Sequence, residues 1–184
     1  MKRVMAWMAA AATLTFAVPT SGGQNDPRLP PLFRSLKSAV SAEEAAPIEA
    51  RIWMLWSTSG DQAVDSLMAV GLAAMGGRRY REALTVLDRV VRRLPDFAEG
   101  WNKRATVHYL MGNLRESTAD IERTLALEPR HFGALSGLGL IGLAQGDDRR
   151  ALEAFEAALA IHPHMAGATT HIRDLRDRLR GRRI

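Results

Sequence analysis

Three prolines, Pro95, Pro129 and Pro163, follow one another at steps of 34 residues. A fixed period of this length is typical of chains built from repeated helical units that stack side by side. One such unit cannot bury its apolar face alone, so neighbouring units must pack together. The period therefore limits the fold to a linear stack of similar units. The three segments of this length are residues 64–97, 98–131 and 132–165.

Residues of similar size recur in the same columns when the three segments are aligned. One column of small residues holds Gly71, Ala105 and Gly139, and another holds Ala83, Ser117 and Ala151. Small residues allow two helices to approach closely. Gly76, Gly112 and Gly146 mark a break in the middle of each segment, and glycine can close a helix in the left-handed conformation. Each segment is therefore predicted to be a pair of helices whose second member ends before the proline.

The composition favours helices over strands. Apolar residues make up 47% of the 184 residues but aromatic residues only 6%, and Ala, Leu and Arg are frequent. These are good helix formers, whereas the β-branched and aromatic residues that fill strands are few. The chain contains no cysteine, so neither disulfides nor thiolate metal sites contribute to its stability. We therefore expect an all-α protein stabilised by packing.

The columns resemble those of the tetratricopeptide repeat (TPR) family, with which segments 98–131 and 132–165 agree over their whole length. The resemblance implies a right-handed superhelical solenoid of three TPR helix pairs over 64–165, with N- and C-terminal capping helices. The predicted caps are an N-terminal helical region, 25–63, and a basic amphipathic helix, 166–184. The fold class is therefore expected to be an all-α solenoid.

The sequence pattern defines the C-terminal cap more clearly than the start of the N-terminal one. Upstream, apolar residues from Ile48 to Trp56 form one stripe, and we expect a helix from about Pro47, preceded by a turn or short helix around 32–38. Residues 18–30 are rich in Gly and Pro and are expected to be a flexible leader. Downstream, Ile172 and two leucines recur at helical spacing among charged residues, which is typical of a cap with one solvated face.

The beginning of the chain has the pattern of a secretory signal peptide. Lys2 and Arg3 precede an apolar run from Val4 to Val18, which is shorter than the roughly 20 residues needed to span a bilayer. We predict that residues 1–17 are a signal cleaved after Ala17, followed by a leader to about residue 24. This predicts an exported protein of the bacterial periplasm. The alternative is a protein held at the inner membrane by an uncleaved signal.

No motif in the sequence predicts catalysis or a cofactor. Gly137, Gly139 and Gly142 fit the pattern G-x-G-x-x-G, but a dinucleotide site needs these glycines to follow a strand and to open a helix. Here they fall inside a predicted helix. His162 and His164 flank a proline without a third ligand nearby, so we expect exposed turn histidines and no metal site. The sequence predicts neither an enzyme nor a cofactor.

The positive charge is concentrated at the C-terminus. The formal net charge is +5, and the tail from Arg173 to Arg183 holds six arginines against two aspartates. No aromatic residue is interleaved with these arginines, so nucleic-acid binding is not expected. Contact between the tail and an anionic membrane surface is possible, and a solvated cap helix explains the same residues.

The resemblance implies a concave groove lined by the first helices of successive repeats, which binds a partner protein or peptide. Arg104 stands where the other two repeats have Val70 and Leu138, and two interpretations remain open for it. It is either a structural arginine paired with Asp120 or Glu122, or a polar anchor for a ligand. The groove residues transferred from the family pattern are Met68, Leu72, Met75, Glu99, Asn102, Thr106, Tyr109, Ser136, Leu140 and Leu143.

Two functions remain open at this point. The first is a non-catalytic interaction module or scaffold of the bacterial cell envelope. The alternative is a structural subunit that self-stacks or assembles into an envelope complex. The family's carboxylate-clamp members hold the terminal carboxylate of a peptide with several basic residues, and Asn102 with Lys103 alone does not reproduce that set.

Overall fold

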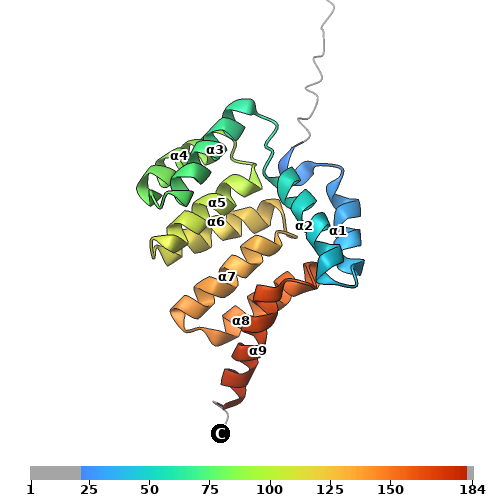
Figure 1. Ribbon diagram of the computed structural model, residues 1–184. Coiled ribbons are helices and arrows are strands. Elements are labelled where there is room, and N and C mark those ends of the chain that lie inside the picture. The colour runs from blue at the N-terminus through green and yellow to red at the C-terminus, as the bar shows by residue number, and fades with distance from the viewer. Residues whose placement is uncertain (1–21, 182–184) are drawn as a thin grey trace, which may run out of the picture.

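The computed structural model describes residues 22–181, and every regular element within that range is a helix. The predicted signal, residues 1–17, lies outside the described residues. The helices stack from α3 at the top of Figure 1 to α9 at the bottom, with α1 and α2 beside the stack. Their bounds are η1 Gly23–Asn25, α1 Leu29–Ser38, α2 Ala42–Trp56, α3 Gln62–Gly76, α4 Tyr80–Arg93, α5 Ala98–Leu110, α6 Leu114–Leu127, α7 Phe132–Gln145, α8 Asp148–Ile161 and α9 Ala166–Gly181.

The three predicted helix pairs are present as α3–α4, α5–α6 and α7–α8. The second helix of each pair ends two residues before its proline, at Arg93, Leu127 and Ile161. This end point is expected, because proline lacks the amide hydrogen that the next turn would need. The all-α solenoid predicted from the 34-residue period is confirmed.

The turn inside each pair uses a residue with positive φ, as the glycines predicted, but not always a glycine. Gly112 has φ +78° and Gly146 has φ +72°. In the first pair the left-handed residue is Arg78, with φ 56°, whereas Gly77 has φ −80°. The glycine pair 76–77 therefore located the turn correctly, but the strained position falls one residue later.

The G-x-G-x-x-G glycines lie inside α7 and are positions of close packing. A Cβ atom added at Gly139 would lie 2.6 Å from the Phe155 ring, and one added at Gly142 would lie 2.8 Å from the backbone nitrogen of Ala151. A Cβ at Gly137 would lie 3.0 Å from a side-chain atom of Ile121. All three glycines thus let α7 approach a neighbouring helix.

The N-terminal helices begin earlier than expected, so α2 contains Pro47 inside it. The backbone N–H of Glu44 donates to the Ser41 hydroxyl at 3.2 Å, and the Glu44 carboxylate accepts from the N–H of Val40 at 2.9 Å. This reciprocal cap satisfies two amides at the helix start. It offsets the one helical hydrogen bond that Pro47 cannot make, so the helix starts at Ala42 and not near the proline.

The pair α1–α2 lies along the loops that connect successive repeats and does not continue the stack before α3. Gln24 accepts a hydrogen bond from the N–H of Ala98 at 3.2 Å, beside the first loop. At the second loop the Trp56 ring stacks on His131, with 4.1 Å between centroids. The connecting loops lie on the side of the stack where α1 and α2 are found (Figure 1). The expectation of a cap over the first repeat was wrong.

Two further expectations about these segments are corrected by the same contacts. His162 is buried and its Nε2 lies 3.1 Å from a Glu49 carboxylate oxygen, while His164 Nε2 lies 2.7 Å from the Ala39 carbonyl oxygen. These histidines connect the third loop to the N-terminal helices and are not exposed turn residues. The leader is also ordered from residue 22 onward, because Gly23 is buried and donates its N–H to the Thr58 carbonyl.

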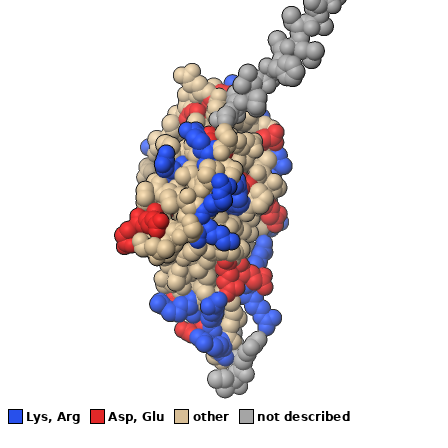
Figure 2. All heavy atoms as spheres, turned by 90° about the vertical axis from the view of Figure 1, so that its right-hand side faces the viewer, with Lys and Arg blue, Asp and Glu red and all other residues tan. Residues whose placement is uncertain are grey.

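The C-terminal helix α9 is the amphipathic cap that the sequence predicted. Ile172 and Leu175 are buried against Phe155 of α8. On the solvated side, Arg176 pairs with Glu156 at 2.6 Å and Arg178 pairs with Asp148 at 3.1 Å. Lys and Arg gather around the lower end of the molecule, where α9 lies (Figure 2). Within residues 22–181, no helix has the length and apolar character that crossing a membrane requires.

The close contact at Gly142 can be tested by substitution with alanine. Alanine is favoured over glycine inside a helix by about 1 kcal/mol, but the added methyl group would meet the Ala151 backbone. We expect Gly142→Ala to lower the free energy of unfolding by about 1–3 kcal/mol, the usual cost of overpacking. Gly76→Ala is the matched control, because no atom lies within 4 Å of its added Cβ. Urea denaturation followed by circular dichroism measures both, and an unchanged or raised stability for Gly142→Ala would contradict the close approach.

Candidate functional site

A hollow of about 140 Å³ lies between α5, α6 and α7. Five of the residues predicted for the concave groove line it: Asn102, Thr106, Tyr109, Ser136 and Leu140. Its remaining lining residues come from α6 and from small residues of α5 and α7. They are Ala105, Ser117, Ile121, Gly133 and Gly137. We call this the α5–α7 groove.

Other residues predicted for the groove lie elsewhere. Met68 is buried in the core of the first helix pair, and Met75 packs against the same core. Leu72 is 41% exposed, and Leu143 packs against the cluster around Phe155. The transfer of positions between repeats assumed that every first helix has the same neighbours. The first and last repeats have different neighbours from the second, so the groove is confined to the middle of the stack.

The buried carboxylate of Glu99 organises one end of the groove. Glu99 is 1% exposed, and its oxygens lie 2.8 Å from Lys103 Nζ and 3.0 Å from His131 Nε2. Asn102 Nδ2 also donates to Glu99 at 2.8 Å. Burial by itself raises the pKa of Glu99, but the hydrogen bond from His131 and the positive charge of Lys103 outweigh it, so the pKa lies below its ordinary value. The carboxylate thus stays charged and holds the start of α7 against α5.

The ring of His131 is oriented by three contacts. Its Nδ1 accepts the backbone N–H of Ala134 at 3.1 Å and so caps α7, which leaves Nε2 as the nitrogen that donates to Glu99. Trp56 stacks on the ring face. A polar group with no exposed surface is stable only when its hydrogen bonds are satisfied. His131 therefore joins α2, α5 and α7 in one rigid unit.

Trp53 closes this end of the groove, which the sequence did not predict. A Cβ added at Gly133 would lie 2.6 Å from Trp53 Cη2, and Lys103 Nζ lies 5.1 Å from the centroid of a Trp53 ring. Trp53 belongs to α2 and lies about 50 residues before Lys103 and about 80 before Gly133 in the sequence. Only the docking of the N-terminal helices brings it to the groove, so no sequence signal could have placed it there.

Arg104 is engaged by two carboxylates of the flanking helices. Its Nε and Nη2 donate to Asp120 at 2.8 and 2.7 Å, and its Nη1 donates to Asp88 at 2.8 Å. The hydrogen bonds to Asp120 are the largest cause of a raised Arg104 pKa. The side chain is 19% exposed and also packs over the Trp101 ring. These contacts favour the structural interpretation of Arg104 over the ligand anchor, with Asp120 as predicted and Asp88 in addition.

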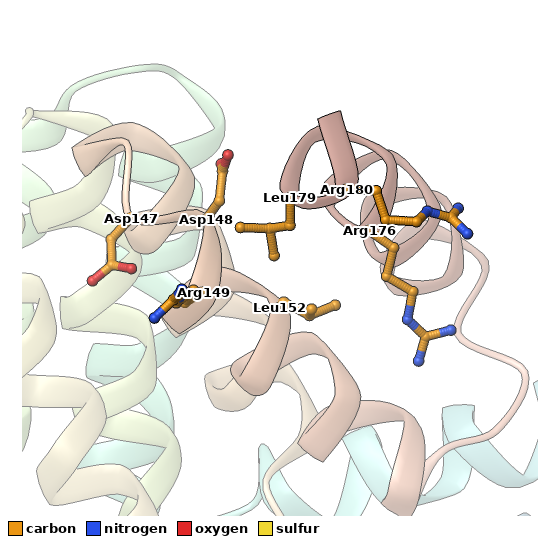
Figure 3. A pocket seen from close by; sticks show the side chains of 7 residues that line it. All are labelled: Asp147, Asp148, Arg149, Leu152, Arg176, Leu179 and Arg180. Atoms are coloured by element: carbon orange, nitrogen blue, oxygen red, sulfur yellow. The ribbon is translucent and has the colours of Figure 1, made fainter. Parts of the chain in front are cut away.

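A second hollow, of about 600 Å³, lies between the start of α8 and the end of α9. Leu179 points into the gap between these helices and Arg180 points away from it (Figure 3), while Arg176 pairs with Glu156 of α8. Both carboxylates and guanidinium groups line it, and Asp148 pairs with Arg178. This mixture of charges does not select one kind of ligand. The residues that line it are Asp147, Asp148, Arg149, Leu152, Arg176, Leu179 and Arg180.

Between residues 22 and 181 there is no group of three or more His, Cys, Asp or Glu side chains placed to hold a metal ion. The charged groups beside the α5–α7 groove, Glu99 and Lys103, satisfy each other. The groove thus offers shape and hydrogen bonding, which suits binding.

A stack of helix pairs with a groove between its first helices defines the class of helical-repeat binding scaffolds. The family model "Tetratricopeptide repeat" matches residues 69–116 and 102–166. A TPR repeat-containing protein of Rhizobium etli is 40% identical over 156 residues, which cover 85% of this chain and 76% of that relative. The chain belongs to the tetratricopeptide repeat family.

Solved structures show the same fold at low sequence identity. The Sgt2 TPR domain from Aspergillus fumigatus has a TM-score of 0.62 and 20% identity, and the match covers 65% of this chain and 81% of that one. The first TPR of Spaghetti, bound to the Hsp90 peptide SRMEEVD, has a TM-score of 0.62 and 20% identity, with 64% and 94% coverage. These likenesses show that the chain shares the fold of these TPR domains.

The lowered pKa of Glu99 predicts acid sensitivity. The folded pKa lies below the unfolded value of about 4.3. The ionised carboxylate therefore stabilises the fold fully above the unfolded pKa, and this contribution is lost as the pH falls through the folded pKa. The free energy of unfolding should decrease below about pH 4.3. Glu99→Gln should show a weaker decrease and cost about 3–5 kcal/mol at neutral pH, because it breaks a buried ion pair.

Denaturant titrations at several pH values measure this dependence. Glu122→Gln, on an exposed part of α6, serves as the control and should follow the wild-type profile. A Glu99→Gln variant with wild-type stability and an unchanged acid limb would show that the carboxylate contributes nothing to the fold.

Proposed function

We propose that this protein is a non-catalytic interaction module of the bacterial cell envelope, and that its α5–α7 groove binds a segment of a partner protein. The family and the fold support binding between proteins. The observation that carries the proposal is the groove itself, where five residues expected to face a partner line one hollow.

The size of the groove limits what it can hold. Small-molecule sites commonly have volumes of roughly 300–1,000 Å³, and the hollow of about 140 Å³ is well below that range. It suits one side chain of a longer segment that lies across α5 and α7. Ala105, Ile121 and Gly137 give it apolar walls, and Tyr109 and Ser136 offer hydroxyl groups at its edge. The bound side chain is therefore aliphatic, with neighbouring backbone groups near the two hydroxyls.

The groove is built to bind without large rearrangement. The hydrogen bonds among Glu99, His131 and Asn102 fix α5 relative to α7, and Trp53 packs at the end of both helices. A site that is already ordered loses little conformational freedom when it binds, so more of the contact energy appears as affinity.

The groove differs from a site for acidic peptide ends. The first TPR of Spaghetti is bound to an Hsp90 peptide that ends in EEVD. In this chain two groups could bind the carboxylate of such a peptide, the Lys103 ammonium and the Asn102 side-chain amide. Both are already bound to Glu99. A peptide carboxylate would have to displace Glu99 from both. The proposed ligand is consequently an internal segment with an aliphatic side chain.

The alternative function, self-stacking end to end, has less support. The C-terminal end carries Arg173, Arg176 and Arg180 on α9, and the opposite end carries Arg89 and Arg92 on α4. Stacking one molecule on the next would bring these positive charges together, which costs free energy at an interface. Binding of a different protein avoids this repulsion.

The groove can be tested with a photoreactive residue in the native cell. A photoreactive phenylalanine analogue in place of Tyr109 lies at the groove, whereas the same analogue in place of Leu110 lies on the exposed side of α5. We expect a discrete adduct from position 109 that mass spectrometry identifies as one protein. Ser136→Arg, which fills the groove, should lower the yield at least about tenfold, the effect of losing a hot-spot contact.

The two analogue positions serve as each other's controls. Equal adducts from positions 109 and 110, or a yield that Ser136→Arg does not change, would contradict binding in the groove. Circular dichroism of each variant shows whether the helical fold is retained.

The proposed location rests on the N-terminal residues of the sequence and has its own test. We expect the protein in the periplasmic fraction, with a mature N-terminus at Val18, because the small residues Thr15 and Ala17 precede that position and suit cleavage. Cell fractionation and mass spectrometry of the N-terminus measure this. An intact Met1 in the membrane fraction would indicate an uncleaved anchor, and an intact Met1 in the cytoplasm would contradict export.

A further inference from the structure

The outer face of α3 is apolar and uncovered. Val70 is 50% exposed, and the sequence from Ser66 to Gly77 contains no charged residue. The helix at the other end of the stack, α9, exposes arginines and aspartates instead. A terminal repeat needs a polar outer face to remain soluble. The α3 end of the stack lacks this property.

The other repeats show what normally covers this face. Val107 of α5, and Phe97 just before this helix, are buried in the core that α3 and α4 form. One repeat earlier, the corresponding residues are Ala63 and Ala73, and both are exposed. On α7, the corresponding Ile141 is buried in the core of the second pair. In both internal cases the second helix of the preceding repeat covers the face, so the face of α3 is shaped for a helix.

The same comparison indicates which residues the missing helix would present. Arg104 on α5 forms ion pairs with Asp120 on α6 and with Asp88 on the preceding α4. The corresponding residues in the first repeat are Val70 and Val86. A helix that packs here therefore needs an apolar side chain where α4 has Asp88.

The edge of this face is positively charged. Leu67 and Val70 of α3 and three arginines of α4 border one shallow hollow of about 800 Å³. Of the arginines, Arg93 pairs with Asp61 at 2.9 Å. Arg89 and Arg92 make no ion pair with any residue in the range 22–181. Acidic residues beside an apolar stripe would complement this edge.

Segments of the chain itself do not fit this description. The N-terminal helices form a core around Trp56 that shares no residue with the α3–α4 core. The sequence before residue 22 carries Lys2 and Arg3 and no acidic residue. The α9 end of a second copy is rich in arginine. The last two would bring positive charge toward Arg89 and Arg92.

We propose that the α3 end face binds an amphipathic helix of a partner protein, whose apolar stripe packs on Leu67 and Val70 and whose flanking acidic residues pair with Arg89 and Arg92. The helix takes the place that the second helix of a preceding repeat would occupy. This surface is separate from the α5–α7 groove, so the two binding proposals can fail independently.

Synthetic helices test the proposal on the full chain. The probe is a fluorescent peptide of about 15 residues, long enough to form a helix when bound, with a leucine stripe flanked by Glu. A second peptide has the same stripe flanked by Lys. Fluorescence anisotropy should show binding of the Glu-flanked peptide and at least about tenfold weaker binding of the Lys-flanked one.

Variants of the protein locate the contact. Val70→Glu should weaken binding of the Glu-flanked peptide at least about tenfold, because it places a like charge in the apolar stripe. The double variant Arg89→Glu with Arg92→Glu should reverse the preference toward the Lys-flanked peptide. Val40→Glu, at an exposed site between α1 and α2, and Ser136→Arg in the groove should leave the affinity unchanged.

Several results would overturn the proposal. These are equal binding of the two peptides, unchanged affinity of a folded Val70→Glu variant, and an unreversed preference in the double arginine variant. Sedimentation velocity without peptide should show a monomer. A dimer that Val70→Glu dissociates would identify a second copy as the occupant and would also overturn the proposal.

Discussion

The structure depends on close contact between helices at small residues. Gly139 and Gly142 allow α7 to approach α8 until ring and backbone atoms of the second helix occupy the space of a side chain. Ser117 has the same role in the middle repeat, where its hydroxyl donates to the Ala105 carbonyl at 2.8 Å. Because each pair is closed in this way, its outer residues are directed toward the next repeat. The stack, and with it the groove, follows from these contacts.

Polar residues are buried where successive repeats meet, and they fix the orientation of the helices. Arg104 joins α4, α5 and α6 through Asp88 and Asp120. His131 and Glu99 join α5 and α7 with the N-terminal helices. Apolar packing alone permits small rotations between repeats, whereas these bonds have one satisfactory geometry. The groove therefore lies where the stack is most firmly held, and the least covered face lies at α3.

The two proposed surfaces differ in physical character. The α5–α7 groove is small and enclosed on one end by Trp53, so it suits a single side chain. The α3 end face is broad, apolar and bordered by arginines, so it suits a helix. A scaffold with one site of each kind can hold two partners at once. This arrangement agrees with a role in assembly and requires no chemistry from the protein.

The 34-residue period, the prolines and the small-residue columns determined the helix pairs, because these depend on local geometry that repeats along the chain. The resemblance to the tetratricopeptide repeat pattern also placed Asn102, Thr106, Tyr109, Ser136 and Leu140 at one groove. The sequence could not place α1 and α2, since an apolar stripe such as that of Ile52 and Trp56 specifies burial but not the neighbour. Only the tertiary structure decided that these helices cover the connecting loops and leave α3 open, because that choice depends on surfaces formed by residues far apart in the chain.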